Sequence, residues 1–174
     1  MSDAPEIPEA TTDFEKKIAI TIAILAVVLS LVNNLGDNSK TDAIIKTNEA
    51  TDKWMYYQAK GIKGQLAEMQ SSLLTDLGGA NITEEAKAKA AKMLTESQRY
   101  DSEKAAIKTD AETLQKQAAV ESAINDRCDF SALLLQIGVV VCSVAILSGW
   151  RLFWFGGMGL GAAGIVIGVT AFLM

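Results

Sequence analysis

FSALLLQIGVVVCSVAILSGWRLFWFGGMGLGAAGIVIGVTAFLM, residues 130–174, decides the fold of this chain. It holds two apolar runs, 130–149 and 152–174, and each is long enough to cross a hydrocarbon core of about 30 Å as a helix. A third run, IAITIAILAVVLSLV at 18–32, gives a helix of about 27 Å when it is extended to Leu35. We therefore expect an all-α integral membrane protein with three transmembrane helices, at 18–35, 130–149 and 152–174.

The first apolar run has two alternative interpretations. A buried soluble helix fits it by length, and Lys16 and Lys17 give it the basic flank of a signal peptide. The residues that follow it, SLVNNLG, contain no small-x-small cleavage site. We interpret it as an uncleaved anchor that follows an acidic tail, residues 1–17.

The flanking charges predict an orientation by a margin of one charge. Lys16, Lys17 and Arg151 flank the membrane on one side, while Lys40 and Arg127 lie among acidic residues on the other. The positive-inside rule therefore places the amino terminus in the cytoplasm and residues 36–129 outside.

The composition disfavours enzymes and nucleic-acid-binding proteins. The chain has a net charge of −5, no histidine and two cysteines. Histidine is the side chain that titrates near neutrality and the commonest metal-binding nitrogen. The lysines are interleaved with Asp and Glu, whereas a phosphate-binding surface needs clustered cations. We expect no catalytic, cofactor or metal site and no nucleic-acid partner.

Residues 36–129 predict a long antiparallel coiled-coil-like helical hairpin between the first and second membrane helices. The segment lacks proline, and only LGGANITEEA breaks its helical texture. Gly78 and Gly79 suit a helix end, and Asn81 suits a helix cap with Glu84 in capping-box spacing. We place the turn at 78–81, so that the arms project about 60 to 70 Å.

Both arms carry apolar or small residues at alternating steps of four and three, the spacing of a coiled-coil seam. The seam expected on the first arm is Met55, Ala59, Ile62, Leu66, Met69 and Leu73. The seam expected on the second arm is Ala86, Ala90, Met93, Ser97, Tyr100, Lys104, Ile107, Ala111, Leu114 and Ala118, continuing through Cys128 to Cys142.

The stretch DKWMYYQAKGIKG, residues 52–64, adds Trp54, Tyr57, Gly61 and Gly64 to the expected packing residues. Each glycine costs about 1 kcal/mol relative to alanine inside a helix, which suggests close approach of another helix. Folding the hairpin about Gly79 sets Tyr100 near Ala59. Gln58 and Lys60 are expected to point outward, toward a partner. Packing within one hairpin and packing between subunits both stay open.

Small residues line one face of the third membrane helix at Gly157, Gly161, Gly164 and Gly168, which permits close helix packing within a subunit or between subunits. Gln136 is expected to make a hydrogen bond between membrane helices. Trp150, Arg151 and Trp154 predict an interfacial belt.

Near the membrane the first arm becomes polar. Asn34, Asn38, Thr41 and Asn48 form a polar seam, which fits a wet space between arms or the lumen of a ring.

The sequence also resembles a family. NEATDKWMYYQAKGIK (48–63) and the ending LLLQIGVVVCSVAILSGWRLFWFGGMGLGAAGIVIG are similar to the bacterial membrane proteins catalogued as domain of unknown function 4337. The resemblance covers nearly the whole chain after residue 13. It implies an architecture in a bacterial inner membrane and no activity.

These patterns favour a non-enzymatic membrane scaffold or accessory subunit that self-assembles through its hairpin and its glycine-striped third membrane helix. The expected partners are membrane lipid, further copies of the chain and another protein. The alternative is an oligomeric channel or solute conduit.

Overall fold

The computed structural model describes residues 13–173 and contains three long helices, α1 (Asp13–Gly78), α2 (Glu84–Ser148) and α3 (Arg151–Phe172). A 3-10 turn, η1 (Gly79–Asn81), follows α1. No strand occurs within residues 13–173, and the expectation of an all-α fold is confirmed. Residues 1–12 of the acidic tail and Met174 lie outside the described residues.

Three helices are long and apolar enough to cross a membrane, as predicted. The apolar stretches of α1 and α2 are parts of much longer helices, of 66 and 65 residues. α1 therefore continues without a break through residues 35 and 36, and α2 through residues 129 and 130. α3 has 22 residues and ends with its apolar stretch.

The turn between α1 and α2 uses a cap that the sequence pattern did not single out. Gly79 has a φ of +48°, which favours glycine, and directly follows the end of α1. The backbone N–H of Ala86 donates to the side-chain oxygen of Thr83 at 3.2 Å. Thr83 thus caps α2, and Asn81, the expected cap, lies in η1. The extra residues between η1 and α2 move the centre of the turn past Gly79.

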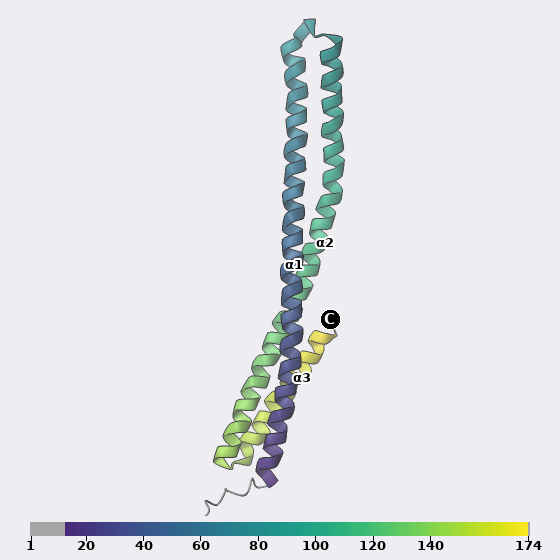
Figure 1. Cartoon of the computed structure of the whole chain (residues 1–174). Helices are drawn as coiled ribbons and strands as arrows, with labels where there is room; N and C mark the ends of the chain where they lie inside the picture. Colours follow the sequence, from purple (N-terminus) through teal and green to yellow (C-terminus); the bar gives the residue numbers. More distant parts are fainter. Residues whose placement is uncertain (1–12, 174) are drawn as a thin grey trace, which may run out of the picture. The chain divides into compact units, whose positions relative to one another are not determined.

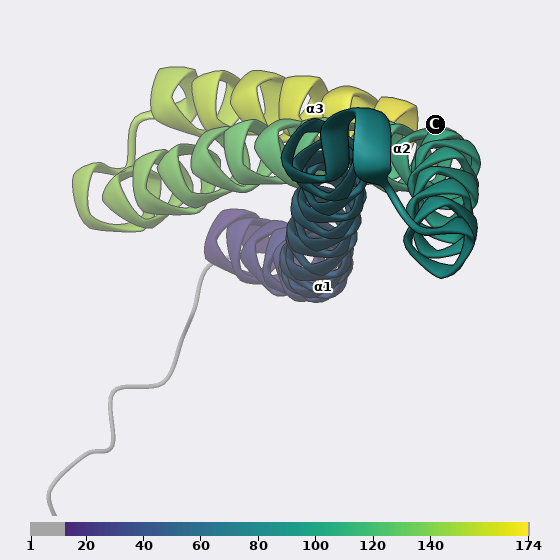
Figure 2. The same cartoon turned by 90° about the horizontal axis from the view of Figure 1, so that it is seen from above.

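A second tight turn joins α2 to α3 at Gly149, whose φ is +67°. Its N–H donates to the carbonyl of Ala145 at 3.0 Å, which closes the end of α2. Figure 2 shows α2 and α3 running alongside each other from this turn.

The chain divides into two compact units, which we describe separately. The three-helix unit comprises described residues 13–41 and 121–173, and the two-helix unit comprises residues 42–120. In the two-helix unit the arms of α1 and α2 lie side by side and run in opposite directions (Figure 1). Lys53 binds Asp110, and Ser71 binds the carbonyl of Ala90.

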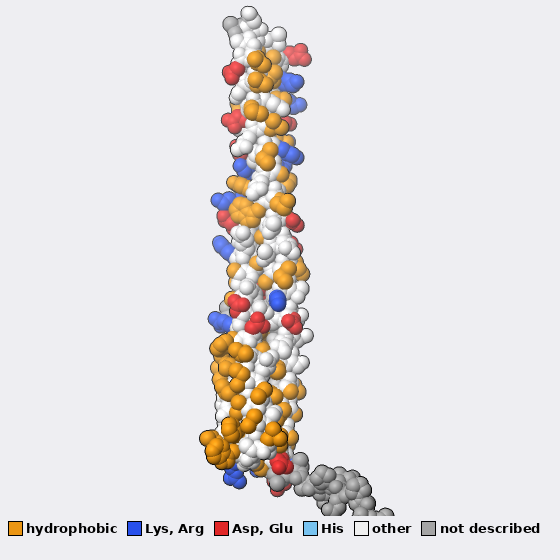
Figure 3. All heavy atoms as spheres, turned by 90° about the vertical axis from the view of Figure 1, so that its left-hand side faces the viewer, with side chains coloured by type: hydrophobic (Ala, Val, Ile, Leu, Met, Phe, Trp, Pro, Cys, Tyr) orange, Lys and Arg blue, Asp and Glu red, His pale blue; other side chains and the backbone are white. Residues whose placement is uncertain are grey.

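The three-helix unit has an apolar core to which all three helices contribute. Ile18, Leu25 and Val32 are buried on α1, and Leu135 and Cys142 are buried on α2. Leu25, Val32, Leu135 and Cys142 each lie against a glycine of α3. The apolar stretches carry hydrophobic side chains on their outer surface as well, and Figure 3 shows them on one face of this unit.

Small residues form most of the buried contact in the two-helix unit. Ala50 and Ala67 are buried on α1 together with Gly64, whereas the buried positions on α2 belong to the expected seam. These α2 positions are Ala90, Ser97, Ile107, Ala111 and Ala118. The two arms thus approach through small side chains on α1.

Candidate functional site

The seam expected on the first arm faces outward within the single chain. Met55, Ile62, Met69 and Leu73 are 64%, 65%, 63% and 55% exposed. Leu66 and Ala59 are also exposed. At about 100° per residue, this row lies on the opposite side of α1 from the buried positions. We call these six residues the outer stripe.

Within a single chain, the outer stripe is therefore not part of the buried packing between the two arms. The outer stripe faces away from α2, because α2 packs against the opposite face of α1, where Gly64 and Ala67 are buried. Leu77, 80% exposed, extends the stripe toward the turn. Packing of this stripe between subunits stays a prediction.

The second arm presents the expected residues to α1. Ile107 is 8% exposed, and Tyr100 and Leu114 are half-buried. Tyr100 lies beside Gly64 and Lys60. The register expected from a fold about Gly79 is therefore displaced by about one helical turn, since the connection includes Ile82 and Thr83.

Four residues of the stretch 52–64 line the contact between the arms. Trp54 and Tyr57 are half-buried and stack edge to face, with ring centroids 5.5 Å apart. The Nζ of Lys104 lies 5.0 Å from the ring centroid of Tyr57. Gly61 faces the side chain of Lys104, and Gly64 faces Tyr100. Trp54, Tyr57 and the two glycines thus lie together on the α2 side of α1, whereas Tyr56 is 51% exposed.

Lys60 also turns toward α2, contrary to the expected outward direction. Its ammonium group donates to Glu103, and its side chain is only 15% exposed. The Nζ lies 5.0 Å from the ring centroid of Tyr100 and 5.4 Å from that of Tyr56. The flexible stem of a lysine can lie along apolar surface while its ammonium group reaches a polar partner. Gln58 remains exposed, as expected.

This ion pair shifts the pKa of both partners. The hydrogen bond to Glu103 raises the pKa of Lys60 above its usual 10.5, although partial burial opposes the change. The hydrogen bond from Lys60 lowers the pKa of Glu103 below its usual 4.5. Both groups are therefore held in their charged forms across the neutral range.

The small-residue face of α3 is buried within the chain. Gly157, Gly161, Gly164, Gly168 and Ala171 are all buried. A Cβ atom added at Gly161 would lie 2.6 Å from Leu25 of α1, and one added at Gly164 would lie 2.9 Å from Leu135 of α2. Ser131 donates a hydrogen bond of 2.7 Å to the carbonyl of Gly164. This face holds α3 against both neighbouring helices, so contact within the subunit occupies it.

The other residues that the sequence singles out in the three-helix unit divide between buried and exposed positions. Gln136 lies on the exposed surface of α2, and its expected bond to another helix stays a prediction. Trp154 is half-buried and donates from its indole nitrogen to Thr21 at 3.3 Å. Trp150 is 64% exposed, and Arg151 lies over the ring of Phe14 at 5.8 Å. Rings from α1 and α3 thus gather at this end of the unit.

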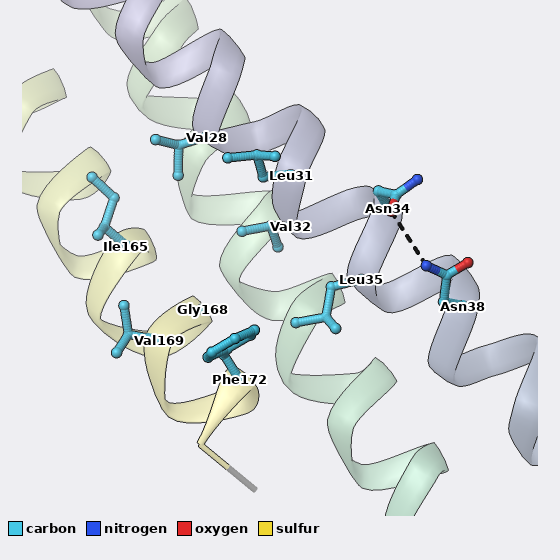
Figure 4. A pocket seen from close by; sticks show the side chains of 10 residues that line it. All are labelled: Val28, Leu31, Val32, Asn34, Leu35, Asn38, Ile165, Gly168, Val169 and Phe172. Atoms are coloured by element: carbon cyan, nitrogen blue, oxygen red, sulfur yellow. Dashed lines mark hydrogen bonds between the residues drawn. The ribbon is translucent and has the colours of Figure 1, made fainter.

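Three residues of the polar seam, Asn34, Asn38 and Thr41, lie on α1 in the three-helix unit, and Asn48 lies on α1 in the two-helix unit. Asn34, Asn38, Thr41 and Asn48 are all exposed, and the amide of Asn38 donates to Asn34 at 3.3 Å. Asn34 and Asn38 border a groove of about 420 Å³ between α1 and α3. Figure 4 shows the apolar residues that line most of this groove.

Residues 13–173 place few side chains together that could bind a metal ion or take part in a reaction. Within residues 13–173, no group of three or more Cys, Asp or Glu side chains is placed to hold a metal ion. Cys128 and Cys142 are free and buried. What the arrangement provides instead is surface for contact, chiefly the outer stripe and the groove.

Comparison with known proteins gives a family and no activity. The family model described as domain of unknown function (DUF4337) matches residues 14–174. No curated protein and no solved structure matches the chain.

Proposed function

Since the chain belongs to the DUF4337 family, whose description assigns no function, we propose from its own surfaces that it is a non-enzymatic membrane scaffold or accessory subunit. Copies of the chain assemble through the hairpin formed by α1 and α2, and a further protein binds the assembled hairpins. The protein lies in a bacterial inner membrane, with its amino terminus in the cytoplasm and its hairpin outside.

The outer stripe is the observation that carries this proposal. Met55, Ile62, Met69 and Leu73 are large apolar side chains that are more than half exposed. Their steps of seven and four belong to the spacing by which helices pack as coiled coils. Exposing apolar surface to water costs about 25 cal/mol of free energy per Å². A second copy that covers the stripe removes this surface from water.

The sequence suggests that copies of the chain also assemble through the glycine face of α3, whereas we propose that this face stabilises a single subunit. Because α1 and α2 of the same chain cover this face, it stabilises the subunit and is not free for another copy. Contacts between subunits therefore rest on the hairpin. The outer surface of α2, with Gln136, adds a polar group that a neighbouring helix can bind within the membrane.

The oligomeric state tests the proposal. Ile62→Lys with Met69→Lys places two charges in the outer stripe, and we expect this variant to be monomeric. Gln65→Lys with Ser72→Lys is the matched control, because both positions are exposed on α1, seven residues apart and outside the stripe. Light scattering in mild detergent and in lipid nanodiscs measures the mass. A monomeric wild type in both media contradicts the proposal.

A second candidate function is a solute conduit. It is supported by the exposure of Asn34, Asn38, Thr41 and Asn48 on α1, since polar side chains of this kind can line the lumen of a ring. This function predicts flux of a small solute across liposomes that contain the protein, and a change in flux when Asn34 or Asn38 becomes leucine. Absence of flux through wild-type oligomers of known mass rules it out.

Labelling of single cysteines tests the orientation. The two natural cysteines are buried, which keeps the background low. Ser72→Cys lies on the hairpin, and Ser148→Cys lies at the turn between α2 and α3; both positions are exposed. A membrane-impermeant maleimide added to intact cells should label Ser72→Cys alone. Labelling of Ser148→Cys alone would reverse the orientation.

A further inference from the structure

The groove between α1 and α3 of the three-helix unit has an apolar lining with two amides at one end. Val28, Leu31 and Leu35 line it from α1, and Val169 and Phe172 line it from α3. Figure 4 shows the row of α1 side chains leading to Asn34 and Asn38. Leu31, Val169 and Phe172 are 67%, 51% and 77% exposed, so the groove is open along its outer side.

The length of the groove matches one leaflet of a bilayer. From Val28 to Asn38 the rise along α1 is about 15 Å, which is half of a hydrocarbon core of about 30 Å. Val28 lies near the middle of the apolar stretch of α1, and Leu35 lies at its end. Asn34 and Asn38 therefore reach the depth of the lipid headgroups, whereas the apolar lining stays at the depth of the acyl chains.

From this match in polarity we propose that the groove is a binding site for one phospholipid, whose acyl chain lies along Leu31, Val169 and Phe172. The amides of Asn34 and Asn38 bind the ester and phosphate oxygens of that lipid. Among residues 13–173, no lysine or arginine lines the groove. The site consequently accepts zwitterionic and anionic phospholipids alike. This inference rests on the proposed membrane location and not on self-association.

The expected preference over bulk lipid is modest. An acyl chain is already in an apolar medium within the bilayer, so the hydrophobic effect adds little to binding. The preference comes from packing and from hydrogen bonds to the two asparagines. Hydrogen bonds of this kind in a membrane correspond to about fivefold enrichment of lipid in the groove over bulk lipid.

A photoactivatable lipid tests the site directly. The wild type is reconstituted in nanodiscs of phosphatidylcholine that contain a trace of the same lipid with a diazirine on its acyl chain. After illumination, adducts are mapped to residues by mass spectrometry. We expect about fivefold more adduct on Leu31, Val169 and Phe172 than on Val166, which is 63% exposed on α3 outside the groove.

Two tryptophan variants make the test specific. Val169→Trp fills the groove and should remove the enrichment on Leu31 and Phe172, while Val166→Trp is the matched control and should leave it unchanged. Asn34→Leu with Asn38→Leu should lower the enrichment without changing adducts on Val166. If the amount of adduct on each residue depends only on how exposed that residue is, the proposed lipid site is wrong, but the membrane location stands. Absence of adducts on every exposed residue of α3 overturns both.

Discussion

Lys60 on α1 binds the carboxylate of Glu103 on α2, and the pair lies against the ring of Tyr100. Arg99 also approaches Glu103, at 3.5 Å from its Nε. The two arms therefore meet here through opposite charges beside an aromatic ring. This contact differs from the purely apolar seam that the spacing on the first arm predicts.

The ion pair predicts how the stability of the two-helix unit varies with pH. The pKa of Glu103 is lowered on folding, so its contribution is present above 4.5 and is lost as pH falls through the lowered value. The pKa of Lys60 is raised, so its contribution is complete below 10.5 and is lost as pH rises through the raised value. Stability should be greatest between these limits.

Thermal unfolding followed by circular dichroism at several pH values measures this effect. Glu103→Gln should lower the melting temperature at neutral pH and reduce its fall in acid, because the variant has no carboxyl group to protonate at this position. Glu84→Gln serves as the control, since Glu84 pairs with Lys87 on its own helix at the surface. If the melting temperature falls equally in acid for the wild type and Glu103→Gln, the Lys60–Glu103 pair does not stabilise the two-helix unit.

Alanine at Gly61 and at Gly64 should stabilise the protein. A Cβ atom at Gly61 would lie 3.4 Å from the flexible end of Lys104, and one at Gly64 would lie 3.5 Å from the Cβ of Tyr100. These are ordinary contacts, so the helical preference of alanine should prevail, by about 0.5–1 kcal/mol at each site. Denaturant unfolding of each variant measures the change. A loss of stability would show that these glycines face a crowded contact, such as one with another subunit.

The cap of α2 offers a test of the turn geometry. Thr83→Ala removes the oxygen that accepts the N–H of Ala86 and should destabilise the protein by about 1 kcal/mol. Asn81→Ala should have a smaller effect, because Asn81 lies in η1 and not at the cap. Unfolding of the two variants under the same conditions gives the comparison. A larger loss of stability for Asn81→Ala would indicate that Asn81, as the sequence suggests, caps α2.

The sequence predicts the helices well because their signals are local. Apolar runs of membrane length and the glycine pair at 78 and 79 depend on short stretches of chain. The second-arm seam was also predictable, since its small and apolar residues fall on one face. On α1 two faces compete, one with large apolar residues and one with Ala50, Gly64 and Ala67. Spacing favours the larger residues, but the face that packs is the one that allows close approach, which depends on α2.

The site could be predicted only in part for the same reason. The sequence predicts Trp54, Tyr57, Gly61 and Gly64 as packing residues, whereas it predicts that Lys60 points outward, toward a partner. Its partner Glu103 is 43 residues away, and no local pattern joins the two. The groove between α1 and α3 likewise depends on the packing of separate helices.

Gly157→Ala should strongly disturb the three-helix unit. A Cβ atom there would overlap the Sγ of Cys142 and lie 2.8 Å from the carbonyl oxygen of Gly138, so α2 and α3 must move apart. Overpacking of this kind costs about 1–3 kcal/mol. Gly159→Ala is the matched control on the same helix, because nothing lies within 4 Å of its added Cβ. Heating in detergent, followed by size-exclusion chromatography of the protein that stays soluble, measures both variants. Equal melting temperatures for the two would mean that α3 does not pack against α2 through Gly157.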